Sequence, residues 1–353
     1  MLNLIVTDGL EDKNNRLLSD LIDLVKSFVT FGRRSNNFMD ALRAEQQKDN
    51  VPEGGVALFI QSVPTRWNST FDMLSRFINL YPYVARVLAN PNLKLKNAPR
   101  MLSGDEIDLL SEIVEILKPF KQATTEISGS DYLTGSLVLP MISCIESALS
   151  TIKPTSEMSK ILLKKLEDSL GIRCAPTQTN PLLCNAVLCD PRFKRLYMKP
   201  VVASQAVMQI KEEIKKEQKE LGNCSPPTPS SSPRRQEDPM SLWSMHDKSL
   251  EKSGMASTEV ESYFPSELKL YLQQPVLHRM QDPIQFWHQS KTLMTALSSI
   301  AMKYLTVVGS SVASERLVST LNSIVKDDRS RLTDRHVTER VFMYRCSKSF
   351  WVD

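Results

Sequence analysis

Apolar residues near the C-terminal end of the chain recur with a helical period on both sides of a short polar break. One stripe has the spacing i, i+4, i+7 and i+11 and consists of Leu293, Leu297, Ile300 and Tyr304, with Leu305 beside it. A second stripe consists of Leu317, Leu321 and Ile324. Between the stripes, Gly309-Ser310-Ser311 suits the end of one helix and the N-cap of the next. The pattern predicts two amphipathic helices joined by a hinge of small residues.

Comparable helical periods run through most of the rest of the chain. They predict helices over residues 1–33, 71–89, 104–119, 136–153, 156–171 and 201–221, and a last helix that begins at Thr333. One short apolar run differs, because Val56–Ile60 lies between two glycines and Pro64. This run predicts a single buried strand over residues 56–61. The chain is therefore expected to be mainly helical.

Residues 222–257 interrupt the helical pattern. They include Ser225-Pro-Pro-Thr-Pro and three consecutive serines, and they contain few apolar residues that could be buried. Such a composition is typical of a disordered linker. The sequence therefore predicts an ordered C-terminal region that resumes at about residue 258.

Charge and composition restrict the function only weakly. The 353 residues include 44 Lys and Arg against 40 Asp and Glu, a net charge of +4. This mild basicity favours nucleic acid slightly, although many unrelated soluble proteins have the same charge. No apolar run reaches the ~20 residues of a membrane span. The first residues carry no basic stretch typical of a signal peptide.

Metal-binding spacing is absent from the sequence. The six cysteines form no Cys-x-x-Cys pair, and the four histidines complete no zinc-finger pattern. We therefore expect reduced thiols in a nuclear or cytosolic protein, with no metal site and no cofactor.

Three motifs carry a family resemblance. They are Thr65-Arg66-Trp67-Asn68-Ser69-Thr70, Asp190-Pro191-Arg192-Phe193-Lys194 and Ser310-Ser311-Val312-Ala313-Ser314-Glu315-Arg316. In this order they resemble the hAT-family transposases and their domesticated descendants, the zinc finger BED domain-containing proteins. Val318 stands where the family has phenylalanine, and Thr320-Leu321 replace the family's usual pair of small residues.

The resemblance implies an architecture. It is a mainly α fold in which a truncated ribonuclease-H-like α/β remnant is split by a large helical insertion and followed by a C-terminal hAT dimerisation region. The implied boundaries are a partial ribonuclease-H-like segment over 1–75, an inserted helical domain over 76–221, the linker over 222–257 and the dimerisation region over 258–353.

The resemblance also implies which residue would take part in catalysis. Only Glu315 matches an acidic position of the family's catalytic triad, and the block with the family's two aspartates is absent from this sequence. Two-metal cleavage of DNA needs several carboxylates around ions about 3.5–4 Å apart. We therefore expect no enzymatic activity, with Glu315 a vestigial position that favours a helix N-terminus. The remaining alternative is a fragment of an active transposase whose aspartates are supplied by a longer product.

Arg66 and Trp67 are the candidates for nucleic-acid binding. In the family this pair lies beside the active site, where the Trp stacks on a base turned out of the duplex. A Trp face offers a base a platform of about 1–3 kcal/mol, and Arg66 can neutralise a phosphate. The competing interpretation is that both residues form a strand-to-helix corner.

The two apolar stripes lead to the preferred functional hypothesis. We expect a domesticated protein that self-associates through Leu293, Leu297, Ile300, Tyr304, Leu305, Leu317, Leu321 and Ile324. Its partner would be a second copy or a related hAT-derived protein, and its location the nucleus, with DNA as a further partner. One alternative is that both stripes pack inside one chain. Another is an inactive DNA-binding remnant that uses Arg66, Trp67 and the lysines near residues 92–96 and 211–219.

Overall fold

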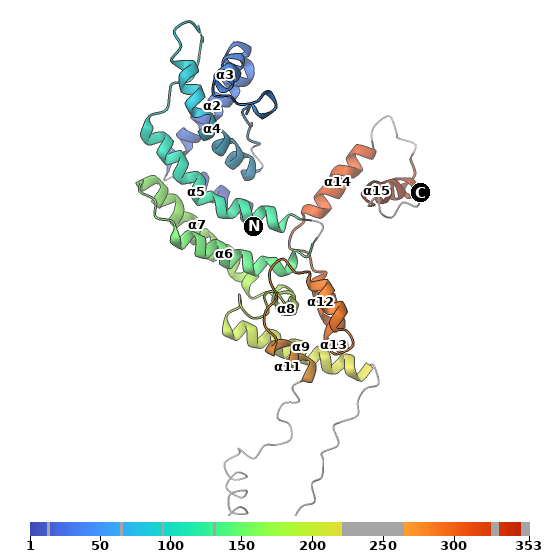
Figure 1. Ribbon diagram of the computed structural model, residues 1–353. Coiled ribbons are helices and arrows are strands. Elements are labelled where there is room, and N and C mark those ends of the chain that lie inside the picture. The colour runs from blue at the N-terminus through green and yellow to red at the C-terminus, as the bar shows by residue number, and fades with distance from the viewer. Residues whose placement is uncertain are drawn as a thin grey trace, which may run out of the picture. The chain divides into compact units, whose positions relative to one another are not determined.

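The regular structure of this protein is helical (Figure 1). The computed structural model describes residues 1–12, 15–63, 66–93, 95–129, 132–220, 265–325 and 332–346. Within these ranges there is no strand, and Val63 and Arg66 form an isolated antiparallel bridge. The mainly α prediction is confirmed. No helix in the described ranges is long and apolar enough to cross a membrane.

The chain divides into two compact units, Met1–Leu183 with Val308–Asp353, and Cys184–Val307. The predicted linker over 222–257 lies outside the described residues. The domain boundaries inferred from the family resemblance stay a prediction.

The first unit is built from amphipathic helices that bury one face each. They are α1 (Leu2–Leu10), α2 (Arg16–Arg34), α3 (Asn36–Lys48), α4 (Trp67–Leu88), α5 (Gly104–Ile127), α6 (Val138–Thr151), α7 (Glu157–Gln178), α14 (Val312–Ile324) and α15 (Asp334–Arg345), with short 3-10 turns η1 (Glu53–Gly55) and η2 (Gly135–Leu137). Helix α5 packs against α4, α6 and α7, and α1 packs against α7. The stripe predicted on α2 is buried, namely Leu18, Leu21, Val25, Phe28 and Val29.

Helix α1 lies very close to α7 because residue 9 is glycine. A Cβ added to Gly9 would lie 2.8 Å from Cδ2 of Leu166 on α7. Asp8 beside it accepts hydrogen bonds from Arg173 of α7, at 2.9 Å from Nε and 2.6 Å from Nη2. A small residue and an ion pair thus join two segments that are far apart in the sequence.

The strand predicted over residues 56–61 is wrong. The segment is extended but has no neighbouring strand. Its backbone is paired by a side chain instead, because the amide of Gln46 accepts from Ala57 N at 2.9 Å and donates to Ala57 O at 3.0 Å. Phe59 is buried between the rings of Phe38 and Phe77, at centroid distances of 6.2 and 6.3 Å. A buried glutamine therefore provides the two hydrogen bonds that a strand partner would have formed.

Two carboxylates on α5 cap helices. Ser103 and Glu106 form a capping box, with Glu106 N donating to Ser103 Oγ at 3.2 Å and Ser103 N donating to Glu106 Oε2 at 2.8 Å. Six residues further along, Glu112 accepts from the backbone N of Thr155 at 2.8 Å and of Ser156 at 3.2 Å. Glu112 thereby caps the N-terminus of α7 from a different helix.

Glu112→Gln should make the protein less sensitive to acid. Burial tends to raise the pKa of Glu112, but the hydrogen bonds from Thr155 and Ser156 outweigh burial and lower the pKa from 4.5 to about 2. Between these values the unfolded chain binds more protons, so stability rises with pH and the contribution is lost as pH falls through about 2. At pH 7 we expect the variant to lose roughly 1–2 kcal/mol of unfolding free energy, the scale of a charged hydrogen bond.

Urea unfolding followed by circular dichroism at pH 7 and at pH 3 measures this difference. Glu115→Gln, at an exposed position on the same helix, is the matched control. Equal pH profiles for Glu112→Gln and Glu115→Gln would contradict the capping role of Glu112.

The second unit contains α9 (Pro200–Glu220), α11 (Ser266–Gln273), α12 (Pro283–Ser290) and α13 (Thr295–Leu305), and most of α8 (Pro181–Cys189). Helix α13 packs against α9, α11 and α12. Asp282 caps α12 by accepting from Ile284 N at 2.8 Å, and Pro283 occupies the first helical position. The helix break predicted at Gly309–Ser311 is confirmed, since α13 ends at Leu305 and α14 begins at Val312.

Candidate functional site

Helices α14 and α15, which together we call the arm, pack against each other (Figure 1). They leave many apolar side chains uncovered. Ile324 is buried and Leu321 is half-buried. Six apolar side chains of the two helices and of Val325, the C-cap residue of α14, are at least 44% exposed. They are Leu317, Val318, Val325, Phe342, Met343 and Tyr344. Such exposure of large apolar groups on two neighbouring helices is typical of a surface that binds another protein.

Glu315 lies on the first turn of α14 and is exposed. Its carboxylate accepts a hydrogen bond from Ser311 Oγ at 2.9 Å. A negative charge at this position favours the N-terminus of a helix. In the described part of the chain, no three His, Cys, Asp or Glu residues are grouped so that they could hold a metal ion.

The first apolar stripe is mostly covered by its own chain. Leu297, Ile300, Tyr304 and Leu305 are at most 4% exposed, whereas Leu293 is 72% exposed because it precedes the start of α13. Tyr304 Oη donates a hydrogen bond to Glu213 on α9. Burial and this carboxylate raise the pKa of Tyr304 to about 12. Four of the eight residues predicted for dimerisation therefore form the core of the second unit, which is the alternative considered from the sequence.

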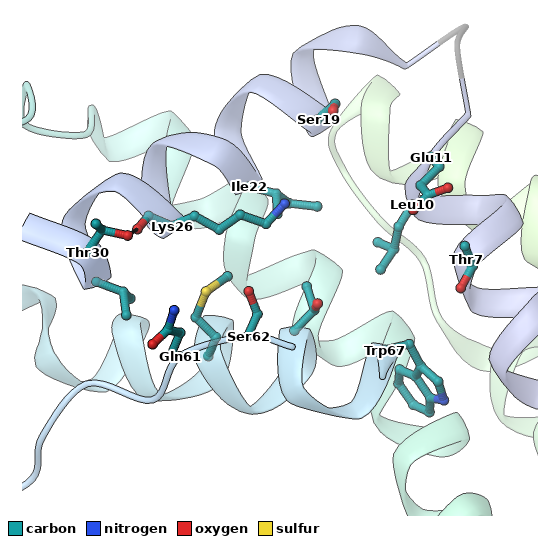
Figure 2. Close-up of a pocket in the computed structure, with 13 residues that line it drawn as sticks. Thr7, Leu10, Glu11, Ser19, Ile22, Lys26, Thr30, Gln61, Ser62 and Trp67 are labelled. Atoms are coloured by element: carbon teal, nitrogen blue, oxygen red, sulfur yellow. Dashed lines mark hydrogen bonds between the residues drawn. The ribbon is translucent and has the colours of Figure 1, made fainter. Parts of the chain in front are cut away.

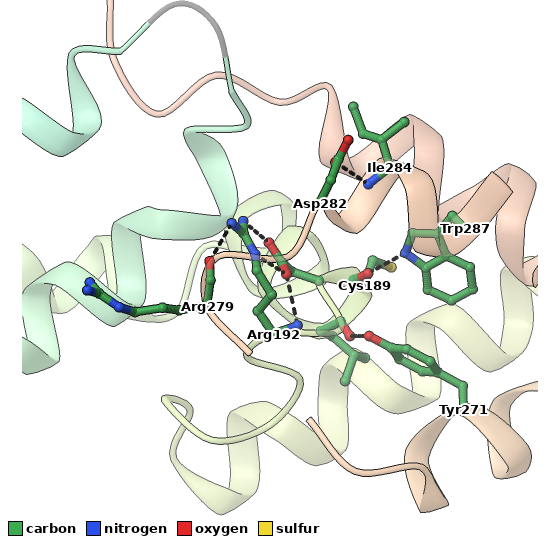
Figure 3. Close-up of polar contacts among 9 residues, drawn as sticks. Cys189, Arg192, Tyr271, Arg279, Asp282, Ile284 and Trp287 are labelled. Carbon is green, nitrogen blue, oxygen red and sulfur yellow. Dashed lines mark hydrogen bonds and ion pairs between the residues drawn. The ribbon is translucent and has the colours of Figure 1, made fainter. Parts of the chain in front are cut away.

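The Asp190–Lys194 motif forms a buried polar turn after α8 (Figure 3). Arg192 contacts Asp190 with both arms of its guanidinium, from Nε to Oδ1 at 2.9 Å and from Nη2 to Oδ2 at 2.7 Å. The backbone N of Arg192 also donates to Asp190 Oδ1 at 3.0 Å. Asp190 is fully buried, so this bidentate pair satisfies a charge that water cannot reach. The side chains of Asp190 and Arg192 therefore stabilise the turn itself.

Lys194 of the same motif closes the C-terminal end of α11. Its Nζ donates to the backbone oxygens of Tyr271 and Gln274, each at 2.6 Å, and lies 4.5 Å from the centre of the Tyr271 ring. The last carbonyls of a helix have no partner within the helix, and the ammonium group provides one. Burial lowers the pKa of Lys194 to about 8. Lys194 also has a positive φ of 49°, in the region that favours glycine.

Two aromatic side chains likewise donate hydrogen bonds to backbone carbonyl groups at the C-terminal end of α8. Tyr271 Oη donates to the backbone oxygen of Leu188 at 2.9 Å, and Trp287 Nε1 donates to that of Cys189 at 2.8 Å (Figure 3). Their ring centroids are 4.8 Å apart. Sequence reasoning missed Tyr271 and gave Lys194 no partner, because these contacts join segments about 80 residues apart.

Arg66 and Trp67 have different environments. Arg66 is exposed, whereas Trp67 is 6% exposed and is the first residue of α4. The indole borders a cavity of about 370 Å³ that is also lined by side chains of α1 and α2, among them Leu10, Ile22 and Lys26 (Figure 2). The backbone N of Trp67 donates to Asn3 Oδ1 at 3.4 Å. This geometry agrees with a structural corner, and it leaves Arg66 as the outward member of the pair.

Two regions of the chain match known families. Residues 267–346 match the hAT family C-terminal dimerisation region, and residues 1–116 match the ZBED1 RNase-like helical domain. The helical fold and these two regions together define a protein derived from hAT transposases. Within that class the chain is similar to the zinc finger BED domain-containing proteins.

Individual relatives agree with this assignment. Zinc finger BED domain-containing protein 4 of Homo sapiens is 25% identical over 352 residues, which cover 97% of this chain and 28% of that protein. A Zea mays protein named as an AC transposase is 24% identical over 375 residues, covering 100% of this chain and 43% of that protein. Zinc finger protein 618 of Mus musculus is 24% identical over 254 residues, which cover 70% of this chain and 24% of that protein. The chain thus spans less than half the length of these curated relatives.

Proposed function

We propose that this chain is a catalytically inactive, domesticated hAT-transposase-like protein that acts by dimerisation. Its partner is a second copy of the chain or a related hAT-derived protein. The match of residues 267–346 to a dimerisation region supports this proposal. The observation that carries it is the apolar surface of the arm.

The arm favours a partner for an energetic reason. Leu317 and Val318 are 44% and 53% exposed, and Phe342 and Tyr344 are 68% and 70% exposed. Removing apolar surface from water contributes about 25 cal/mol per Å². Aromatic side chains such as these are also the residues that most often dominate binding energy at interfaces. A partner helix that covered the exposed side chains of the arm would therefore stabilise the complex. Neither of the two units of the chain would have to change its internal packing.

Val318→Asp and Phe342→Asp should each weaken self-association at least about tenfold, because each places a charge on a surface from which a bound partner excludes water. Neither residue is buried in the single chain, so folding should be unaffected. Sedimentation velocity over a series of concentrations measures the dissociation constant. Ile172→Asp, which changes a side chain 76% exposed on α7, is the matched control. A wild-type chain that stays monomeric well above micromolar concentration would contradict dimerisation.

The proposal of catalytic inactivity is supported by the surroundings of Glu315. The carboxylate accepts a hydrogen bond from the hydroxyl of Ser311, whereas two-metal cleavage needs further carboxylates around the ions. Incubating the purified chain with transposon-end DNA in magnesium buffer tests this part. Cleavage that is lost in Glu315→Gln would overturn it.

We further propose that the protein works in the nucleus, in a DNA-associated or transcription-related role. The names of its relatives, two zinc finger proteins and a transposase, support this placement. Binding of DNA through Arg66 is a narrower version of the same proposal, and the exposure of Arg66 is compatible with it. The absence of any DNA retention in a filter assay at low salt would remove the direct-binding version.

A further inference from the structure

The segment that leads into the arm is attached to the end of α5 and to the loop that follows it. The backbone N of Gly309 donates to Thr134 Oγ1 at 3.0 Å, and Ser310 Oγ donates to the backbone oxygen of Ile127 at 3.1 Å. Thr134 is 7% exposed, so its hydroxyl is shielded from water. We call these four residues, Ile127, Thr134, Gly309 and Ser310, the latch.

The latch requires glycine at residue 309. A Cβ built on Gly309 would lie 2.5 Å from the backbone oxygen of Thr134 and 2.9 Å from its carbonyl carbon. Carbon atoms do not approach a backbone oxygen this closely, and a backbone cannot rotate aside as a flexible side chain can. Any residue larger than glycine must therefore separate the segment from the loop.

The latch lies just before a helix start that lacks an ordinary cap. Helix α14 begins at Val312 with Ser311 as its N-cap residue, but the Ser311 side chain accepts no hydrogen bond from the first turn. Its hydroxyl donates to Glu315 instead. The entry of the chain into α14 is thus held by Gly309 and Ser310 from outside the helix. Leu317 and Val318, two of the apolar residues of the arm, lie little more than one turn further along α14.

We infer that the latch is a positioning device for self-association: it keeps the start of α14 formed before a partner binds. This inference rests on the proposed dimerisation. A segment that is already ordered loses less conformational freedom on binding, so ordering it in advance raises affinity without adding a contact. Gly309, Ser310 and Thr134 are accordingly positioning residues, which act through Leu317 and Val318.

Two variants break the latch in different ways. Gly309→Ala introduces the steric conflict with Thr134, and Thr134→Val removes the acceptor of the Gly309 N–H at similar side-chain shape. The matched control is Gly171→Ala, the same chemical change in α7 where an added Cβ would have no atom within 4 Å. Because the two variants act on opposite sides of the contact, a folding defect in one leaves the other as a test.

Two measurements on the full chain test the inference. Sedimentation velocity should show dimer dissociation constants about fivefold to tenfold higher for both latch variants than for wild type, the range of one or two lost hydrogen bonds. Hydrogen exchange on the dilute, monomeric chain should show faster exchange of residues 309–316 in both variants, with Gly171→Ala unchanged in both assays.

The outcomes separate this inference from the proposed function. In one outcome the wild-type chain never dimerises, although the amide of residue 309 is protected in wild type and loses protection in the variants. This outcome removes the dimerisation proposal and, with it, the purpose of the latch. A wild-type chain that dimerises, together with latch variants that have wild-type affinity and wild-type exchange, overturns the latch alone. Faster exchange without weaker affinity also overturns it, since the device would then have no effect on binding.

Discussion

Replacing Trp287 with alanine is expected to lower the unfolding free energy of the second unit by about 3–5 kcal/mol, the usual loss for truncating a large buried aromatic. Trp287 is 1% exposed, and its ring contacts the rings of Tyr271 and Phe286 at centroid distances of 4.8 and 5.1 Å. Alanine would leave a cavity and would also leave the backbone oxygen of Cys189 without the indole donor. Both effects act in the same direction, which is why this variant has the largest expected effect.

A graded series separates the two contributions of Trp287. Trp287→Phe keeps most of the packing but removes the N–H, so it should lose roughly 1–2 kcal/mol, the cost of an orphaned buried acceptor. His288→Ala, at the next, exposed position of α12, should stay within about 0.5 kcal/mol of wild type. Urea unfolding followed by circular dichroism and by near-ultraviolet signals measures all three. A Trp287→Ala variant as stable as His288→Ala would show that α12 does not depend on this contact.

Lys194→Met is expected to destabilise the same unit by about 2–4 kcal/mol, because it leaves buried carbonyl groups without a donor. The carbonyls are those of Tyr271 and Gln274, which receive the Lys194 ammonium at 2.6 Å each. Methionine has a similar length and keeps the strained φ of 49°, so the difference reports the ammonium group and not the backbone.

The control for Lys194 is Lys199→Met, a loss of the same charge at an exposed position before α9. It should change the unfolding free energy by less than about 0.5 kcal/mol. Hydrogen exchange at the C-terminal end of α11 should increase in Lys194→Met alone. Equal stability of the two lysine variants would mean that α11 is held without its lysine cap.

The apolar stripes show how far a period in the sequence leads. Leu297, Ile300 and Tyr304 predict a helix, and α13 confirms it. The same period holds for Leu317 and Leu321 on α14, yet the first stripe is buried in its own unit while Leu317 is 44% exposed. Periodicity reports which side of a helix avoids water. It does not report whether the chain itself or another molecule covers that side.

Residues 56–61 give the opposite lesson. An apolar run between glycines and a proline predicts a strand because such runs are usually buried in sheets. Burial did occur at Phe59, which is 8% exposed, but the hydrogen bonds came from the Gln46 side chain. The sequence does not reveal that a glutamine 11 positions away from Ala57 forms the hydrogen bonds that a neighbouring strand would have formed. The burial was therefore predictable, whereas the partner was not.

Interactions between residues a few positions apart determined the helices, the capping box at Ser103 and Glu106 and the break at Gly309–Ser311. The family motifs are likewise patterns of neighbouring residues, so the sequence alone contains them. The tertiary structure alone decided that Lys194 caps α11, that Trp67 is buried and that Gly309 contacts Thr134. Most of these contacts join segments that are distant in the chain. Their energies depend on close approach of particular atoms, which arises only when the helices have packed.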